Sequence, residues 1–382
     1  MKKIAIVGAG IGGLATALAI PNSNYRVDVF ERASEIKGVG SGLTLWPNAT
    51  CVLQALGVLD KCRSKSGNLS TLKIHLADNR SVMTIPTGDF PTPAIAMHRG
   101  DLHAILMSKL TTHTIYRGWQ CIGVRSAPDG TYVRFNEGEK GPYDLVIAAD
   151  GIRSVLRTHV RQNLELRKKG YSIWRGVANA ADLFPSDGNF YEVWGKGLRF
   201  GILPLSQGQV CWYAARTQQP GDRRPIADQK KSLLAEFDSW KFPARELVDR
   251  TSLEHLIPSD VAVLKPCRGW SRDRVLLMGD AIHPMAANLG LGGNMALEDA
   301  LILGNLLRRS DNIDDVCFDF EKLRYARVAS VTEDSNLIGF LCQTKNPIVS
   351  SCRNFAASLI PGRYFTWESR ALYAYRADRI AA

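Results

Sequence analysis

The sequence predicts an α/β fold: a Rossmann-like domain assembled from separate stretches of the chain, with an inserted, mostly antiparallel β-sheet domain and C-terminal helices. Three observations support this prediction. A short apolar run at residues 4–7 leads into a glycine-rich turn and then a helical pattern. Two further apolar runs, at 145–149 and 275–278, are typical of buried parallel strands. Between them, residues 171–264 contain several alternating segments of the antiparallel type.

The N-terminal stretch carries a dinucleotide-binding pattern. Gly8, Gly10 and Gly13 stand at the positions of G-x-G-x-x-G, with Gly12 beside them, between a predicted strand and a predicted helix. The first glycine permits a tight turn, the second lets the backbone approach a pyrophosphate, and the third packs helix against strand. Glu31, at the tip of the next predicted strand, is placed for a ribose hydroxyl pair. We expect a bound dinucleotide rather than a signal peptide, because glycines interrupt the apolar run.

Composition excludes several classes of protein. The 382 residues are enough for two domains with cores of their own. The formal charge of +11 is spread along the chain without a zinc finger, helix-turn-helix or RNP-like string, so we expect no nucleic acid partner. The excess of positive charge instead suits phosphates and acidic substrates. No apolar run reaches the ~18 residues of a membrane span.

Cysteine and histidine spacing points to a cytoplasmic protein without a metal site. The eight cysteines form no C-x-x-C pair, which argues against a zinc site, a dithiol redox centre or a disulfide scaffold. They are expected to be reduced thiols, as in the cytosol. The seven histidines form no ligand cluster. The sequence leaves open whether the protein is a monomer or a homodimer.

The chain is expected to leave the nucleotide-binding domain and return to it. The first domain is assigned to residues 1–76, 94–170 and 266–310, the β domain to 77–93 and 171–265, and a C-terminal helical segment to 311–382. Within these ranges the sequence predicts helices at 49–59, 226–240 and 293–309, and residues 97–102 lead into a further helix that runs through 109. It also predicts a hairpin at 72–77 and 80–85, and strands at 132–135, 143–148, 171–177, 189–194, 198–203 and 210–215. A glycine-rich loop at 38–43, which includes Gly42, is compatible with backbone close to a ligand or with a plain loop.

Two acidic residues follow two of the buried strands. Asp150 ends the run at 145–149, and Asp280 comes after the run at 275–278. Open α/β sheets bind ligands at the carboxyl ends of their strands. Either acid alone is more typical of a turn. The pair, in this order after two apolar runs, predicts a site at which carboxylates order waters and hydroxyls along a bound dinucleotide.

A second glycine-rich turn opens the predicted helix at 293–309. Gly290, Gly292, Gly293 and Asn294 precede or begin it. Glycines let backbone N–H groups reach a flat ring, and the helix N-terminus contributes about half a positive charge, worth roughly 0.3–1 kcal/mol toward an anion. A reduced isoalloxazine is anionic at N1, so this turn is a candidate binding place for such a ring.

These motifs resemble the class A FAD-dependent monooxygenases, the single-component group of p-hydroxybenzoate hydroxylase and salicylate hydroxylase. The resemblance covers about residues 2–310. Its pieces are the glycine motif at 8–13, Glu31-Arg32, His98-Arg99, Asp150-Gly151 with Ser154 and Arg157, Trp174-Arg175-Gly176, and Gly279-Asp280-Ala281 with His283-Pro284.

The resemblance implies a cofactor set and a reaction. It implies that the cofactor is bound by Gly13, Glu31, Arg32, Arg99, Arg157, Asp280 and the Gly290–Asn294 turn. It also implies that Asp150 helps both FAD and a transient NADPH or NADH. Reduced FAD would meet O2 to give a C4a-hydroperoxide. This species would hydroxylate (or epoxidise) an electron-rich aromatic or polycyclic small molecule.

Such a mechanism depends on a pocket that excludes water and holds the substrate in place, and it depends less on acid–base groups of the protein. The aromatic residues of the β domain could wall it: Trp174, Phe190, Trp194, Phe200, Trp212 and Tyr213. Each of them singly is more typical of a core. As catalytic candidates, Tyr213 could orient a phenol, and Arg199 (or Arg216) could grip an acidic substrate.

The sequence departs from the family pattern after His283-Pro284. Ala287 stands in place of the usual second proline, and Leu291 in place of the usual glutamine. This departure bears on oxygen activation and substrate placement, since the proline carbonyl lies near the flavin in relatives. Two other readings remain: an FAD-dependent reductase or dehydrogenase without oxygen transfer, and a non-catalytic flavin-binding protein. Consumption of O2 and of NAD(P)H separates the three.

Overall fold

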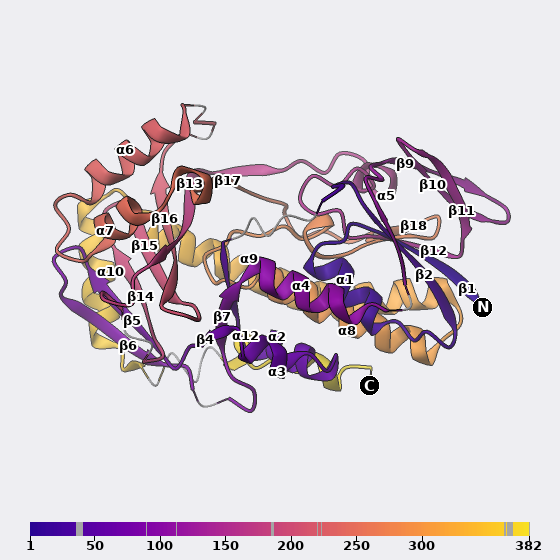
Figure 1. The fold of residues 1–382 in the computed structure, drawn as a ribbon, viewed down its shortest axis with the longest axis horizontal. Helices are drawn as coiled ribbons and strands as arrows, with labels where there is room; N and C mark the ends of the chain where they lie inside the picture. The colour runs from indigo at the N-terminus through magenta and orange to yellow at the C-terminus, as the bar shows by residue number, and fades with distance from the viewer. Residues whose placement is uncertain are drawn as a thin grey trace.

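The computed structural model describes residues 1–35, 41–88, 90–111, 113–184, 187–219, 221–222, 224–362, 364 and 370–381. They form two lobes bridged by long strands and one long helix (Figure 1). None of the described helices is long and apolar enough to cross a lipid bilayer.

The first lobe is built on a six-stranded sheet in the order β18-β19-β12-β1-β2-β8. These strands are β18 (Ser271–Arg272), β19 (Val275–Leu277), β12 (Leu145–Ala148), β1 (Lys2–Val7), β2 (Tyr25–Glu31) and β8 (Thr114–Arg117). All of them except β18 run parallel, so the carboxyl ends of β1, β2, β12 and β19 meet at one edge. This topology confirms the predicted α/β fold and its return to the first sheet.

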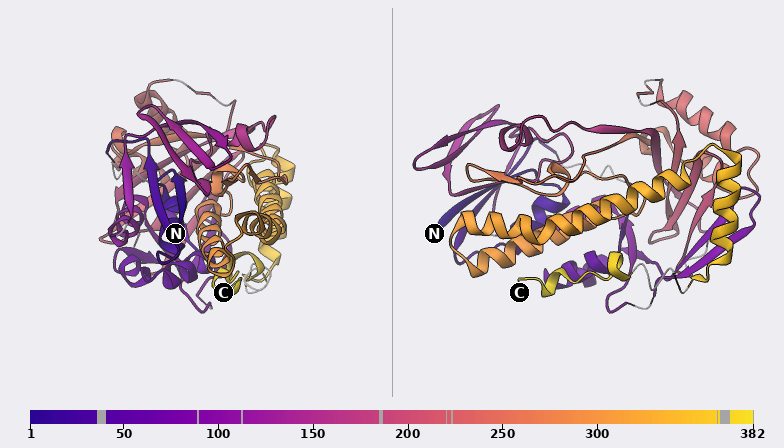
Figure 2. Two further views of the ribbon diagram at one scale, coloured as in Figure 1. Left: turned by 90° about the vertical axis from the view of Figure 1, so that its right-hand side faces the viewer. Right: turned by 180° about the vertical axis from the view of Figure 1, so that it is seen from behind.

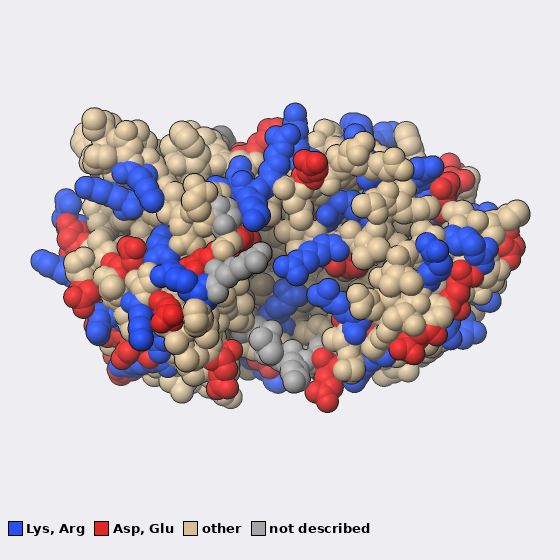
Figure 3. Space-filling model, turned by 90° about the horizontal axis from the view of Figure 1, so that it is seen from above, with Lys and Arg blue, Asp and Glu red and all other residues tan. Residues whose placement is uncertain are grey.

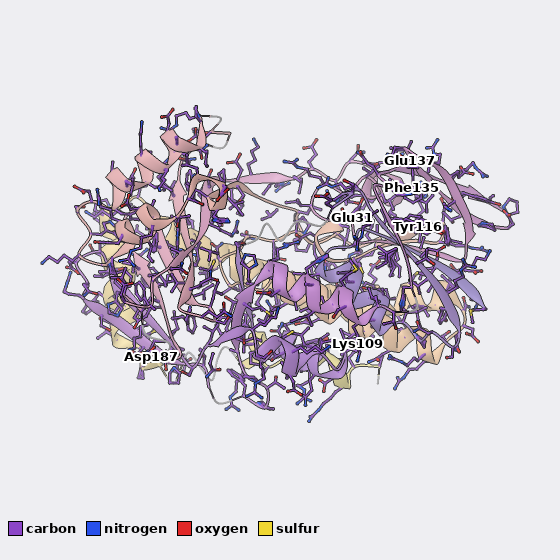
Figure 4. All side chains as sticks on the ribbon, in the orientation of Figure 1. Glu31, Lys109, Tyr116, Phe135, Glu137 and Asp187 are labelled. Carbon is purple, nitrogen blue, oxygen red and sulfur yellow. The ribbon has the colours of Figure 1, made fainter. Side chains whose placement is uncertain are left out.

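Helices and a small sheet cover the first lobe's sheet. Helix α1 (Ile11–Ala19) packs along α8 (Gly292–Arg309), where a Cβ on Gly12 would lie 3.1 Å from the Ala296 Cβ. On the other side in Figure 1 lie β9 (Cys121–Ala127), β10 (Gly130–Phe135) and β11 (Gly138–Tyr143). Phe30 of β2 stacks on Phe135 of β10 at 4.4 Å, which anchors the small sheet, and on Tyr116 of β8 at 4.8 Å. Figure 4 labels Phe135 and Tyr116 in this part of the first lobe.

The second lobe is a seven-stranded sheet in the order β17-β13-β16-β15-β14-β5-β6. The strands are β17 (Ile257–Val263), β13 (Arg167–Asn179), β16 (Gln209–Thr217), β15 (Leu198–Pro204), β14 (Asn189–Trp194), β5 (Thr71–Leu76) and β6 (Ser81–Pro86). Helices α6 (Ile226–Phe237) and α7 (Ala244–Arg250) and the short η1 (Leu253–His255) accompany it. The pairing is antiparallel except between β14 and β5, which confirms the predicted antiparallel character.

The domain boundaries stay a proposal, and strand pairing refines two of them. β5 lies within the stretch 1–76 that the sequence assigned to the first domain, yet it hydrogen-bonds to β14 and β6 of the second sheet. β13 begins at Arg167, four residues before the proposed start at 171. Both differences have one cause: pairing partners far apart in sequence, which local patterns do not reveal, decide which sheet a strand joins.

A third group of elements lies between the lobes. It comprises β3 (Gly42–Leu45), β7 (Ile95–His98), β4 (Ser66–Asn68), α2 (Pro47–Ala55), α3 (Leu59–Arg63) and α4 (Arg99–Lys109). The helix predicted at 49–59 was wrong in its bounds. Helix α2 ends at Ala55, because Gly57 adopts a φ of +68° that starts a turn before α3. Of the loop predicted at 38–43, residues 38–40 lie outside the described residues, and β3 begins at Gly42.

The C-terminal segment is helical, as predicted. Helix α9 (Ile313–Cys342) runs from the first lobe to the second, and α10 (Pro347–Leu359) turns over the edge of the second sheet (Figure 2). The remaining short elements are α5 (Arg157–Val160), η2 (Gly279–Ala281), α12 (Arg370–Tyr373) and η3 (Ala377–Arg379). At 30 residues, α9 spans about 45 Å, which lets one helix contact both lobes.

Candidate active site

The glycine turn after β1 forms a cradle that is open to an anion. Gly8 has a φ of +107°, and a Cβ on Gly13 would lie 1.9 Å from the Gly8 carbonyl oxygen, so neither position tolerates a side chain. At Gly10, the N-cap of α1, a Cβ would meet no described atom within 4 Å. No side chain caps this helix end, so its first N–H groups remain available to a phosphate.

Glu31 is fixed beside this turn. Its two carboxylate oxygens accept hydrogen bonds from the backbone N–H groups of Ala9 and Ala33, each at 3.0 Å. His103 of α4 reaches the Ala9 carbonyl oxygen at 2.7 Å and braces the turn from the other side. Figure 4 shows Glu31 at the tip of β2. The next residue, Arg32, has an exposed side chain.

The two acidic strand tips converge on the same edge. A Cβ on Gly8 would lie 3.0 Å from the Asp150 nitrogen, which places Asp150 at the mouth of the glycine turn. Its Oδ2 accepts from the Val155 N–H at 2.9 Å, whereas its buried Oδ1 has no partner among the described residues. Burial raises the pKa of Asp150 and also that of Asp280, which lines the central cleft. Both side chains are therefore poised to accept protons or hydroxyl donors.

Arg157 holds the two acidic loops together from behind. Its side chain is buried, and it donates to the carbonyl oxygens of Ala281 at 2.6 Å, Ile152 at 2.9 Å and Asp280 at 3.0 Å. The sequence predicted a cofactor contact for Arg157. Because the guanidinium donates to protein carbonyl groups, we interpret this arginine as a positioning residue.

The turn before α8 presents backbone to the cleft. Gly290 has a φ of +65°, and a Cβ on Gly293 would meet no described atom within 4 Å. Gly290, Gly292 and Gly293 all line the cleft. Asn294, predicted as a cofactor ligand, is buried: its Oδ1 accepts from the Trp46 N–H at 2.8 Å, and its Nδ2 donates to the Gly290 carbonyl oxygen at 2.8 Å. We assign Asn294 to shaping the turn.

Gly42 and Arg99 complete the cleft wall on this side. Gly42 begins β3, and its N–H donates to the Cys211 Sγ at 2.9 Å, where a Cβ would clash with that side chain. Packing against Cys211 therefore requires a glycine at this position. Gly42 also lines the cleft. Arg99, at the start of α4, is exposed and lines the cleft.

A buried charge network beneath the Asp280 loop was missed by sequence reasoning. Asp299 of α8 accepts from His283 Nε2 at 2.7 Å, Arg324 Nε at 2.7 Å and the Gly279 N–H at 2.9 Å. Burial opposes its ionisation, but the adjacent His283 and Arg324 hold the pKa of Asp299 at about 2. Glu298 binds the same Arg324 at 2.7 Å. The only sequence signal was two consecutive acids inside an apolar helix.

A cleft of about 760 Å³ separates the lobes. One wall of the cleft is formed by the loop that carries Asp280 and by the turn at Gly290. The opposite wall is the inner face of the seven-stranded sheet. Leu72, Ile85, Phe190 and Leu203 give that face an apolar character. In the space-filling view, Lys and Arg side chains gather around the hollow between the lobes (Figure 3).

Tyr213 lines the cleft, and its hydroxyl is bound to a carboxylate that the sequence did not indicate. Its hydroxyl donates to Glu192 Oε2 at 2.5 Å, and burial raises its pKa far above the usual range. Trp194 Nε1 donates to Glu192 Oε1 at 2.7 Å. Arg199, the second predicted catalytic residue, lies behind this group, 3.5 Å from Glu192 and 1% exposed. It neutralises Glu192 instead of lining the described cleft.

The aromatic residues that were predicted to line the pocket lie on two opposite faces of the sheet, because side chains alternate along each strand. Phe190 and Tyr213 face the cleft. Trp174, Phe200 and Trp212 point to the opposite face, where they form a core with α6 and α7. Arg216 stacks over the Trp174 ring on that face, so it cannot grip a substrate in the cleft. Successive side chains of a strand alternate between faces, and the sequence did not show which face was inner.

Arg175 is a cation at the junction of the two walls. It lines the cleft, and its Nη1 donates to Ser259 Oγ at 2.9 Å. Burial lowers the pKa of Arg175. The sequence offered Arg175 only as part of a family motif.

These features fit an FAD molecule. The open Gly10 position and the uncapped α1 suit a pyrophosphate, Glu31 suits a ribose, and the unpartnered Asp150 Oδ1 suits a hydroxyl donor. The open Gly293 position at the uncapped N-terminus of α8 suits the carbonyl edge of a flat ring. Fold and site together define a flavoprotein of the monooxygenase type, with an apolar chamber beside the ring position.

Comparison with known proteins identifies the family. A family model described as an FAD binding domain matches residues 1–310, so the chain belongs to this family. It is 30% identical to aurachin C monooxygenase/isomerase of Stigmatella aurantiaca, with 90% of each chain covered. It is 32% identical to 2-heptyl-3-hydroxy-4(1H)-quinolone synthase of Pseudomonas aeruginosa, with 94% of each covered. The protein is therefore an FAD-dependent monooxygenase, as the sequence predicted.

Solved structures share the whole architecture. Klebsiella pneumoniae HpxO in complex with FAD and uric acid superposes with a TM-score of 0.89 at 24% identity, covering 99% of this chain and 96% of that one. A salicylate hydroxylase substrate complex gives a TM-score of 0.81 at 20% identity, with 100% and 97% covered. These likenesses confirm the predicted fold class, including the inserted sheet and the C-terminal helices.

Proposed function

We propose that this monooxygenase hydroxylates an uncharged, fused-ring aromatic compound that carries an apolar substituent, with NADPH or NADH as reductant. The balanced reaction takes one O2, one NAD(P)H and one proton, inserts one oxygen atom into the substrate and releases water. FAD, when bound, supplies the oxygen activation. The single observation that carries the substrate class is the group of apolar side chains along the cleft, which extends from the sheet face at Leu72 and Phe190 to Leu337 and Ile338 of α9.

The residues on the inner face of the seven-stranded sheet favour a substrate with an uncharged ring. The positive charge of Arg199 is balanced by Glu192, and Arg216 lies on the other face of the sheet, so neither offers a free cation to a carboxylate. Tyr213 and Glu192 instead provide a hydroxyl and a carboxylate oxygen within the cleft wall. A ring N–H or hydroxyl placed there would donate to Glu192 and become more electron-rich, which favours attack on an electrophilic oxygen.

Apolar residues supply the room for a substituent. Beyond the ring position the cleft is bordered by Leu337 and Ile338 of α9 and by Leu372 and Tyr373 of the C-terminal segment. Burial of one CH2 group contributes about 0.8 kcal/mol, so a chain of several carbons adds substantially to binding. Both similar relatives reported above act on or form compounds that their names describe as aurachin C or a 2-heptyl quinolone.

We propose that Arg175 and Arg99 act in the half of the reaction in which NAD(P)H reduces the flavin. Both line the same cleft as the Gly290 turn, and a reduced flavin is anionic. Fixed positive charge beside that ring stabilises the anion before oxygen arrives. The same cations suit a nicotinamide cofactor that docks transiently. We further propose a cytoplasmic enzyme that acts as a monomer or homodimer.

The test is a stoichiometric assay on the FAD-loaded protein. NAD(P)H oxidation, O2 uptake and peroxide are followed with a 2-alkyl-4(1H)-quinolone, the same ring without the alkyl chain, and salicylate. We expect one labelled oxygen atom from 18O2 in the product, and a lower KM for the alkylated ring than for the bare ring. Product without O2 consumption would favour a reductase, and equal KM values for the two rings would refute the substituent pocket.

A further inference from the structure

One tyrosine of the C-terminal segment carries a hydroxyl that no described residue binds. Tyr373 ends α12, is partly buried and lines the cleft. Its hydroxyl forms no hydrogen bond with a described residue and is not sealed off by protein. Tyr213, by contrast, already donates its hydroxyl to Glu192. Tyr373 therefore retains a hydrogen-bond donor for a ligand.

Packing fixes the ring of Tyr373 close to the flavin position. The ring packs on Trp46 with the centroids 4.3 Å apart. Trp46 is held in turn, because its N–H donates to Asn294 Oδ1 at 2.8 Å and its Nε1 donates to the Leu289 carbonyl oxygen at 3.1 Å. A Cβ on Gly290 would lie 3.4 Å from Trp46 Nε1. Tyr373 is therefore one aromatic ring away from the turn that suits the flavin.

The backbone that precedes Tyr373 is tied to α9. Arg327 of α9 donates from Nη1 to the Ala371 carbonyl oxygen at 2.8 Å and from Nη2 to the Leu372 carbonyl oxygen at 2.5 Å. The same guanidinium binds Glu298 of α8 at 3.1 Å. Side chains of α8 and α9 thus hold this segment in place, so a hydrogen bond from Tyr373 to a ligand requires little further ordering of the protein.

The sheet side of the cleft offers an acceptor. Phe190 of β14 packs edge-on against Trp46 at 5.8 Å. Glu192 comes two residues later in β14, so its side chain leaves the same face of the strand, and it lines the same cleft. Burial raises the pKa of Tyr373, and the negative charges of Glu192 and Asp334 raise it further. The tyrosine hydroxyl therefore stays protonated in neutral solution and can donate, whereas the Glu192 carboxylate can accept.

We propose that Tyr373 is a substrate-binding residue that donates a hydrogen bond to a ring carbonyl oxygen, while Glu192 accepts one from a ring N–H. This assignment rests on the proposed function and narrows its substrate class to fused rings with an N–H and a carbonyl group on opposite sides, as in a 4(1H)-quinolone. Two fixed contacts on opposite sides of a ring determine which carbon atom faces the flavin. A site built to bind a ring oxygen also discriminates against analogues that lack it.

The experiment measures binding to the full-length holoenzyme without NAD(P)H, so that no ligand is turned over. The change in absorption of oxidised FAD gives the dissociation constants of a 2-alkyl-4(1H)-quinolone and of a 2-alkylindole with the same chain. The indole keeps a fused ring and its N–H but lacks the carbonyl oxygen. The variant is Tyr373→Phe, which removes one oxygen atom and keeps the ring on Trp46. The matched control is Tyr375→Phe, whose ring packs against the Arg327 guanidinium at 4.6 Å, outside the described lining of the cleft.

We expect Tyr373→Phe to weaken quinolone binding about three- to tenfold, the usual effect of losing one neutral hydrogen bond, and to leave indole binding within about twofold of the wild type. Tyr375→Phe should bind both probes like the wild type, and FAD content should not change in either variant. The proposal is overturned if Tyr373→Phe weakens both probes equally, which indicates packing alone, if it weakens neither, or if Tyr375→Phe has the same effect.

A turnover assay separates this inference from the proposed function. With NAD(P)H and 18O2, the wild type should hydroxylate the quinolone, and Tyr373→Phe should raise KM more than it lowers kcat. Selective loss of quinolone binding in Tyr373→Phe, without labelled product from the wild type, would overturn the proposed function and support the binding role of Tyr373. A wild type that binds neither probe would overturn both.

Discussion

Replacing Gly10 by alanine should weaken FAD binding without weakening the fold. Gly10 has a φ of −73° and a ψ of −178°, a conformation that alanine adopts freely. The new Cβ would meet no described atom within 4 Å. The position lies at the N-cap of α1, where a pyrophosphate must approach the first N–H groups of the helix. The methyl group therefore fills space that only the ligand uses.

The magnitude follows from the two effects of the methyl group on the bound phosphate. A hydrogen bond to a charged group contributes about 1.5–3 kcal/mol, and overpacking costs about 1–3 kcal/mol. One lost bond with mild overpacking gives about 3 kcal/mol, which corresponds to about 150-fold weaker binding. In the apoprotein, alanine is a poorer N-cap than glycine, but it lowers the entropy of the unfolded chain. These terms oppose each other, so the free energy of unfolding should change by less than about 1 kcal/mol.

Gly13→Ala is the matched comparison. Its Cβ would lie 1.9 Å from the Gly8 carbonyl oxygen, so the turn and α1 must move apart even without ligand. We expect this variant to lose about 3 kcal/mol or more of folding free energy. Urea unfolding of the two apoproteins and titration with FAD, followed by quenching of flavin fluorescence, give both quantities. FAD binding by Gly10→Ala within about threefold of the wild type would refute the assignment of the cradle. Equal destabilisation of the two apoproteins would refute it as well.

Three further predictions concern other parts of the site. Asp299→Asn should lower the free energy of unfolding by about 3 kcal/mol at pH 7 in urea titrations. Because the folded-state pKa of Asp299 is about 2, against 3.8 for a free side chain, its contribution is complete above about pH 4 and fades as the pH falls toward 2, where wild type and variant should converge. Tyr213→Phe should lower coupled product formation about tenfold and raise peroxide release, while Tyr116→Phe, in the aromatic cluster of the first lobe, should do neither. Arg157→Lys should weaken FAD binding about tenfold through the loops it holds, with exposed Arg153→Lys unchanged in the same titration.

Local patterns were sufficient for the nucleotide-binding half. The glycines at 8, 10 and 13 and the acid at 31 are contiguous in sequence with the elements that use them, so one strand, turn and helix predict the cradle. Asp150 and Asp280 were predicted to converge because parallel strands present their carboxyl ends at one edge. β12 and β19 do pair in parallel in the structure.

Long-range pairing decided the substrate half. Glu192 meets Tyr213 and Arg199 because β14, β15 and β16 are neighbours in the sheet, and no pattern within one strand indicates such a triad. The inner and outer faces of the sheet were likewise undetermined, so Arg199 was expected at a surface that it does not reach. The contacts of Arg157 were also not predictable from local patterns. Its guanidinium donates to carbonyl groups of two loops that are more than a hundred residues apart in sequence.

The sequence by itself determined the fold class and the cofactor cradle, because glycine conformations and helix ends are local properties of the chain. The type of reaction was implied by the resemblance of its motifs to a known family. Only the tertiary structure decided which side chains face the cleft and which charges neutralise each other. These properties depend on which surfaces are buried against which. That outcome is settled by packing among strands and helices distant in sequence.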